Sequence, residues 1–184
     1  MTTQHVTART ISPAGLLSPQ ENAPLPTEDR LAIHELIARH CLALDTGDEA
    51  HLASIVTEDF RQEHAVFGAM EGRSGFAALM RDNPELLGAI RHQAVNIAAV
   101  GTGTETAKAV HYTIVMQVHA MGAEPTALLP RLFAHGVVRD QLVKQDGRWL
   151  IHRRTYDQMS LTADLFPEDQ RKEALRRRTP DWET

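Results

Sequence analysis

The sequence predicts an α+β fold: a cone-shaped barrel whose curved, mainly antiparallel sheet carries helices on its concave side and encloses a pocket. Two observations predict this class. In the first half of the chain apolar residues recur at helical spacing, and in the second half apolar and polar residues alternate between turn signals. Helices followed by a run of antiparallel strands are typical of an α+β domain with the helices on one face of the sheet.

Composition narrows the class of protein further. The 184 residues suit one domain, and the formal charge of -5 without a basic stripe argues against nucleic-acid binding. A single cysteine precludes an internal disulfide, and no apolar run predicts a membrane span or a secretory signal. We therefore expect a cytoplasmic protein. Ten histidines are the unusual feature, since histidine is the side chain suited to proton transfer near neutral pH.

The predicted domain begins after a proline-rich lead-in. Residues 1–26 show no sustained period, and we expect a flexible N-terminal arm. A helix is predicted from Thr27 to the region of Gly47, which is placed for a C-terminal cap. Its buried stripe is expected to comprise Ile33, Leu36, Ile37, His40, Cys41 and Leu44.

Two shorter helices and a strand follow. Asp48 is placed to cap the second helix, and a third helix follows Gly72 and ends at Pro84. A short strand is predicted over 60–67, between these helices. The residues expected to face inward from the two helices are Leu52, Ile55, Val56, Phe76, Leu79 and Met80.

Four longer strands are predicted in two hairpins. The first hairpin comprises 90–100 and 106–119, joined by a Gly-Thr-Gly-Thr turn. The second comprises 132–145 and 148–155, joined by Asp-Gly, which is a strong hairpin signal.

The chain is predicted to close with a helix. This helix is expected over 168–178, where acidic and basic residues alternate at four-residue spacing. We therefore divide the chain into an arm, a domain over 27–157 and a helical tail over 158–184.

The first hairpin decides which polar residues share a face. A two- or four-residue loop places His92 opposite Thr113, so that His92, Asn96 and His111 lie on one face of the sheet. A three-residue loop would place Tyr112 there instead. Small residues between His92 and Asn96 suit a cavity wall, although a partly solvated sheet face has the same pattern.

The register of the second hairpin determines which charged residues lie opposite each other. If Gln145 pairs with Arg148, Asp140 lies beside Arg153, and the two form a cross-strand ion pair of modest strength. In this register Arg154 is expected to be exposed, with binding of an anionic ligand as the alternative.

Two polar residues lie on the buried face of the first helix. His40 lies within the apolar stripe, and Asp45 shares the same face at the last turn. A carboxylate on a buried face is costly unless it is paired, but an Asp near a helix end also caps turns, and His40 also suits a satisfied core position. No zinc, nucleotide or serine-nucleophile motif is found, so we expect no metal and no cofactor.

The order of these elements resembles the SnoaL-like group of the nuclear transport factor 2-like superfamily. The resemblance covers residues 27–157. The matching segments are EDRLAIHELIARHCLALDTGDEAHLASIVTEDF (28–60), EGRSGF (71–76), RHQAVN (91–96), TAKAVHYT (106–113) and HGVVRDQLVKQDGRWLIHRR (135–154). Each segment is weak by itself, but their order and spacing together are specific for the fold.

The resemblance implies an Asp-His pair. Some members of the superfamily, such as scytalone dehydratase, the bile-acid 7α-dehydratase and the lindane dehydrochlorinase, are cofactor-free lyases with this pair in the cone. The corresponding positions here are Asp45 and His92. The bile-acid enzyme has a Tyr at the position of His40, so an imidazole replaces a phenol here. Because this fold carries many reactions, the resemblance does not by itself name one.

Together these observations predict a cofactor-independent lyase or isomerase. His92 is the expected general base, Asp45 orients it and stabilises its charged form, and His40 acts as an acid or polarises an oxygen. The residues expected to bind the substrate are His64, Asn96 and His111. The expected substrate is small and mostly apolar with a few oxygens, such as a polyketide, steroid or terpenoid.

Other functions fit the same cone. One is a polyketide cyclase or an epoxide-hydrolase-like enzyme. Another is a non-catalytic ligand-binding module or partner subunit. For each of these functions, the lyase or isomerase included, we expect a homo-oligomer, a dimer or a trimer.

Overall fold

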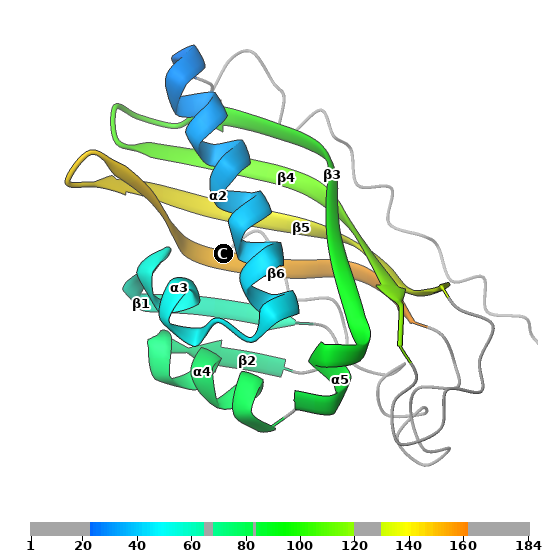
Figure 1. Cartoon of the computed structure of the whole chain (residues 1–184). Helices are drawn as coiled ribbons and strands as arrows, with labels where there is room; N and C mark the ends of the chain where they lie inside the picture. Colours follow the sequence, from blue (N-terminus) through cyan, green and yellow to red (C-terminus); the bar gives the residue numbers. More distant parts are fainter. Residues whose placement is uncertain (1–22, 65–67, 83, 120–129, 162–184) are drawn as a thin grey trace, which may run out of the picture.

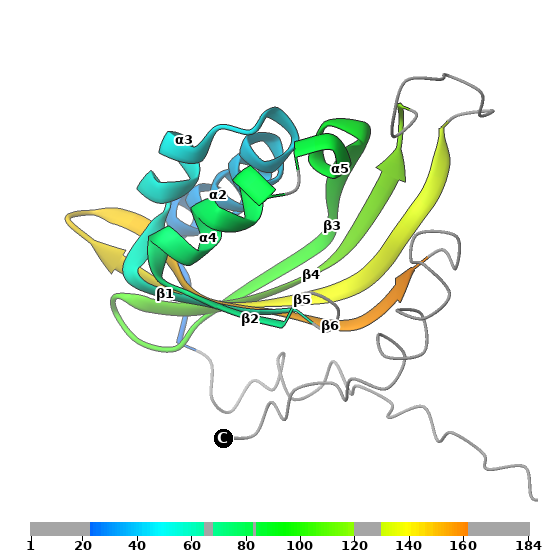
Figure 2. The same cartoon turned by 90° about the horizontal axis from the view of Figure 1, so that it is seen from below.

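A single curved sheet organises the structure, a computed structural model that describes residues 23–64, 68–82, 84–119 and 130–161 (Figure 1). The sheet strands are β1 (Val56–His64), β2 (Gly68–Glu71), β3 (Ile90–Gly101), β4 (Thr106–Gln117), β5 (Arg131–Gln145) and β6 (Arg148–Leu161). The helices are α2 (Thr27–Thr46), α3 (Glu49–Ser54), α4 (Gly72–Asp82) and α5 (Pro84–Ala89). Figure 2 shows these helices on the concave side of the bent sheet.

The strands follow the order β2-β1-β6-β5-β4-β3. All neighbours are antiparallel except β1 and β6, which run parallel. The predicted α+β class and the curved, mainly antiparallel sheet are therefore confirmed. The sheet remains open, because β2 and β3 are its two edges and do not pair with each other.

The three helices predicted for the first half of the chain and both hairpins are present, with two additions. The short edge strand β2 and the six-residue helix α5 were not predicted, because segments this short carry too little periodicity. The equally short α3 was predicted from its capping residue, Asp48. Most of the predicted arm (1–22) and the predicted helix over 168–178 lie outside the described residues. No helix in the described segments is long and apolar enough to cross a membrane.

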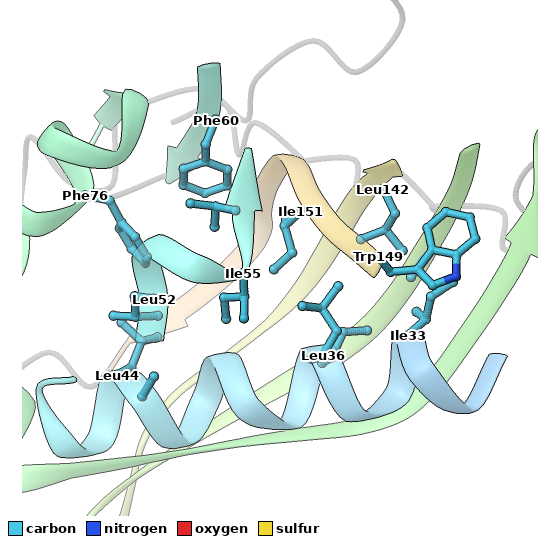
Figure 3. Packing of buried hydrophobic residues seen from close by; sticks show 14 of the residues in the cluster. Ile33, Leu36, Leu44, Leu52, Ile55, Phe60, Phe76, Leu142, Trp149 and Ile151 are labelled. Carbon is cyan, nitrogen blue, oxygen red and sulfur yellow. The ribbon is translucent and has the colours of Figure 1, made fainter. Parts of the chain in front are cut away.

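The core forms where α2 crosses the strands. Its apolar stripe is buried, with Ile33 and Ile37 fully inaccessible. Figure 3 shows Ile33 and Leu36 of α2 on the side of Leu142, Trp149 and Ile151 of the β5-β6 hairpin, and Leu52 of α3 near Leu44 at the other end of α2. Burial of apolar surface stabilises the protein by roughly 25 cal/mol per Å². We expect the burial of this stripe to be the main contribution that holds α2 against the sheet.

Gly47 ends α2 in the left-handed conformation, with φ of 68°. We expect Gly47→Ala to lower the free energy of unfolding by about 1 kcal/mol, because a Cβ is strained at this φ. Urea denaturation measures this. The matched control is Gly88→Ala in α5, where no atom lies within 4 Å of an added Cβ and φ is not positive. A Gly47→Ala protein as stable as this control would contradict the prediction.

Asp29 ties the first turn of α2 to the second hairpin. Its Oδ1 accepts hydrogen bonds from Lys144 Nζ at 2.7 Å and from Trp149 Nε1 at 2.9 Å. The bond from Lys144, together with that from Trp149, lowers the pKa of Asp29 below its ordinary value of 3.8. These contacts set where the N-terminal end of α2 lies on the sheet.

This lowered pKa predicts a pH-dependent effect of Asp29→Asn. The carboxylate contributes stability above its unfolded-state pKa, and that contribution is lost as the pH falls through the lower folded-state value. The variant is therefore expected to be less stable than the parent at neutral pH, with a deficit that shrinks below pH 3.8. Urea denaturation across this range measures it, with exposed Asp82→Asn as the control. A deficit independent of pH would exclude the charge as its cause.

The register of the first hairpin differs from the prediction. Gly101 pairs with Ala107, so the loop is longer than expected, and His92 lies opposite Val115 rather than Thr113. The shift of two residues leaves His92 and His111 on the same face, as predicted. A bulge interrupts β3, since Asn96 and Ile97 together oppose a single residue of β4.

The second hairpin also contains a bulge, which corrects the predicted charge pairing. Gln145 does pair with Arg148, but the register shifts between Gln141 and Leu142. Asp140 consequently lies opposite Arg154 rather than Arg153. The expected Asp140–Arg153 pair is therefore wrong: Arg153 pairs with Glu63.

Candidate acid-base site between the first helix and the sheet

Asp45 lies at the last turn of α2, where the helix end meets the start of β3. Its Oδ1 and Oδ2 accept hydrogen bonds from the backbone N–H of His92 at 3.0 and 3.1 Å. Its Oδ1 also lies 2.7 Å from Nδ1 of the His92 ring. Gly47 ends the helix two residues later, so Asp45 lies in its last turn.

The contact between the two side chains determines how the His92 ring is protonated. A carboxylate only accepts hydrogen bonds, so Nδ1 of His92 carries a hydrogen and donates it. In the neutral ring Nε2 is then the basic nitrogen. The side chains of Asp45 and His92 are 7% and 13% exposed, so the pair is largely shielded from water.

His40 lies one turn earlier on α2 and is fully buried. Its ring stacks on Phe76 of α4, with centroids 5.7 Å apart. Its Nδ1 lies 2.6 Å from Nη1 of Arg154 on β6. Burial, with the charges of Arg154 and the neighbouring His92, holds the pKa of His40 well below its usual range.

Arg154 forms a buried ion pair with Asp140 of β5. Nε and Nη2 of Arg154 donate to the two carboxylate oxygens at 2.7 and 2.9 Å, in the two-pronged geometry that suits a guanidinium. The side chains are 1% and 0% exposed, so the expectation of an exposed Arg154 is wrong. Burial alone would lower the pKa of Arg154, but Asp140 raises it, and the guanidinium stays charged.

His111 lies beside this ion pair on β4. Its Nδ1 lies 3.3 Å from the carbonyl oxygen of Tyr112, which only accepts, so Nδ1 donates. Its Nε2 lies 3.8 Å from Oδ2 of Asp140, beyond hydrogen-bonding distance. Burial lowers the pKa of His111 to about 4, which leaves Nε2 as an unprotonated acceptor at neutral pH.

His64, the last residue of β1, lies opposite Tyr156 of β6. Their ring centroids are 4.7 Å apart. Burial lowers the pKa of His64 to about 3 and raises the pKa of Tyr156 to about 12. Both side chains are therefore neutral near pH 7. The guanidinium carbon of Arg154 lies 6.0 Å from the centre of the Tyr156 ring.

The structure brings most of the predicted site residues onto one side of the sheet. Asp45 and His92 are in direct contact, and His92 and His111 both influence the buried imidazole of His40. Asn96 is the exception. It lies in the β3 bulge with φ of 56°, and its side chain is exposed.

Three residues of the cluster were not predicted: Asp140, Arg154 and Tyr156. The Asp140–Arg154 pair was missed because the bulge in the second hairpin places Arg154, rather than Arg153, opposite Asp140 on the inner face. Tyr156 shares the face of Arg154 by simple alternation, and this signal was available once Arg154 was known to point inward. Among the described residues no group of three or more His, Cys, Asp or Glu is placed to hold a metal ion.

The curved sheet with helices on its concave side agrees with the sequence comparison. The profile of the SnoaL-like domain matches residues 26–155, and the chain belongs to this family. Comparison with curated proteins finds no match.

Solved structures share the fold at low sequence identity. An NTF2-like protein with a cystatin-like fold from Novosphingobium aromaticivorans is 22% identical, with a TM-score of 0.61 over 80% of this chain and 89% of that one. A putative scytalone dehydratase from the same species is 19% identical, with a TM-score of 0.59 over 72% and 87%. ActVI-ORFA from Streptomyces coelicolor is 25% identical, with a TM-score of 0.60 over 69% and 95%.

Proposed function

We propose that this protein is a cofactor-independent lyase or isomerase that transfers protons on a small, mostly apolar, oxygenated substrate. The observation that supports this most directly is the 2.7 Å contact between Asp45 Oδ1 and His92 Nδ1. An imidazole oriented by a buried carboxylate is a recurrent general base in enzymes.

In this proposal His92 Nε2 removes a proton from a carbon next to a carbonyl group. Asp45 keeps the hydrogen on Nδ1 and stabilises the imidazolium that forms. The two hydrogen bonds from the His92 backbone hold the carboxylate in place, so little reorganisation accompanies the proton transfer. The proton then returns to another carbon in an isomerase, or a leaving group departs in a lyase.

The surroundings of the pair favour an apolar substrate. Phe76 stacks on His40, and His64 and Tyr156 are neutral near pH 7. The charged groups of the cluster, Arg154 and Asp140, are paired with each other. The fold similarity to a putative scytalone dehydratase agrees with a cyclic, oxygenated substrate such as a polyketide, steroid or terpenoid. An aldol-type cyclase remains the second enzymatic candidate, because it begins with the same proton abstraction.

Proton exchange in heavy water tests this proposal and does not require the natural substrate. A panel of cyclic ketones is incubated with the protein in D₂O, and deuterium at the α-carbon is followed by NMR. We expect exchange above the buffer rate for at least one ketone, and loss of that exchange in Asp45→Asn and His92→Ala. Ligand binding without exchange, unaffected by Asp45→Asn, would instead indicate a non-catalytic binding module.

A further inference from the structure

Two buried imidazole nitrogens of the cluster lack a hydrogen-bond partner among the described residues: Nε2 of His111 and Nε2 of His40. Buried polar atoms are nearly always hydrogen-bonded, so Nε2 of His40 calls for a partner that the described residues do not supply.

The chemistry of Arg154 shows that this nitrogen is a donor. Every nitrogen of a guanidinium donates and none accepts, so Nδ1 of His40 must accept the hydrogen bond from Arg154 Nη1. A neutral imidazole with an accepting Nδ1 carries its hydrogen on Nε2. His40 therefore presents an unused N–H group.

Asp140 fixes the orientation of the Arg154 guanidinium, and with it the hydrogen bond to His40. It takes up Nε and Nη2 of the guanidinium through two oxygens, which leaves Nη1 directed at His40. A planar guanidinium held by two parallel bonds has little freedom to rotate. Arg154 thus donates to Asp140 on one side and to His40 on the other, and all three groups are buried.

We propose that Arg154 and Asp140 are positioning residues that hold His40 as a neutral Nε2–H donor, and that this donor binds the carbonyl oxygen of the substrate. The assignment of the carbonyl rests on the proposed function, in which His92 removes the neighbouring proton. His40 then stabilises the negative charge that develops on the oxygen as the proton leaves. It does so by hydrogen bonding and does not transfer its own proton.

The N–H group of His40 narrows the substrate class. A carbonyl oxygen accepts hydrogen bonds and matches Nε2–H of His40, whereas a substrate with only a halide leaving group makes no comparable use of it. The titratable groups that face His40 are Arg154 on β6, His111 on β4 and His92 on β3. Their combined effect and burial keep the ring neutral, which is the form the donor role requires.

The tautomer of His40 can be measured without any substrate. In long-range ¹H–¹⁵N NMR spectra of the whole protein at neutral pH, we expect His40 to carry its hydrogen on Nε2 alone. The double variant Arg154→Met/Asp140→Leu removes the donor without leaving a lone buried charge, and we expect a mixture of tautomers in it. The control is Arg153→Lys, on the adjacent residue that pairs with Glu63, which should leave the spectrum of His40 unchanged.

The carbonyl contact is tested with a ketone labelled with ¹³C at its carbonyl carbon, for example 1-indanone. We expect binding to move the carbonyl resonance downfield, His40→Met to remove most of this shift, and His40→Gln, whose amide N–H can donate, to restore part of it. Hydrogen on Nδ1 of His40 in the parent protein, or an equal shift in His40→Met, would overturn the inference. The proposed function fails separately, if the tautomer and shift are as expected but His92→Ala does not alter deuterium exchange.

Discussion

Replacing His92 with Ala is expected to slow α-proton exchange of a bound ketone by about 10²–10⁴-fold, the usual contribution of a positioned general base. Nε2 of His92 is the basic nitrogen that the Asp45 contact leaves available for a substrate. The fold should survive, because the backbone N–H of residue 92 still binds Asp45. The exchange rate is measured by NMR in D₂O with the ketone in excess.

The substitution Asp45→Asn tests the role of the carboxylate separately from that of the imidazole. The amide still accepts the backbone N–H of His92 but no longer requires a hydrogen on Nδ1, so the base loses both its tautomer and its stabilising charge. We expect a loss comparable to that of His92→Ala and little further loss in the double variant, because the two residues act as a unit.

Two substitutions serve as controls for this pair. They are exposed His135→Ala on β5 and exposed Asp82→Asn on α4, and each should exchange at the parent rate. Full activity in both Asp45→Asn and His92→Ala would refute the acid-base role of the pair.

Arg154→Met is expected to lower the free energy of unfolding by about 3–5 kcal/mol, the cost of leaving one member of a buried ion pair without its partner. Asp140 is completely inaccessible and takes both of its bonds from Arg154, so its charge would remain unsatisfied. Urea denaturation followed by circular dichroism measures the change.

The double variant Arg154→Met/Asp140→Leu tests the physical reason. Replacing both members with apolar side chains of similar size is often neutral or even stabilising, so we expect the double variant to regain most of the lost stability. Arg153→Met, next to it in sequence but paired with the half-buried Glu63, should cost far less. Additive losses from the two single variants would mean that the pair is not coupled.

Stability alone does not account for the buried ion pair. Such a pair is weak evidence for stability, since apolar residues would serve as well. The contact from Arg154 to His40 gives the pair a different use, because it orients the one imidazole nitrogen of His40 that lacks a partner among the described residues.

Much of the candidate site could be predicted from local patterns. The apolar stripe of α2 and the glycine that ends it place Asp45 on the buried face at the last turn. Strand alternation places His92 and His111 on one face, and a register error of two residues preserves that face. These features depend on residues close in sequence, so their signals are strong.

Other features depended on where distant segments meet. The bulge in β3 turns Asn96 outward, and the bulge in the β5-β6 hairpin turns Arg154 inward. A bulge adds one residue to a strand without a reliable sequence signal, and one residue is enough to reverse the face of every side chain beyond it. For this reason the predicted Asp140–Arg153 pair was wrong by one position.

The sequence by itself determined the α+β class, the helix-end position of Asp45 and the strand face of His92. Only the tertiary structure decided that these two side chains touch, and that Asp140, Arg154 and His40 form a buried chain of hydrogen bonds. The reason is physical. Periodicity reports which face of an element is buried, whereas the partner of a buried polar group depends on the register and crossing of elements far apart in the chain.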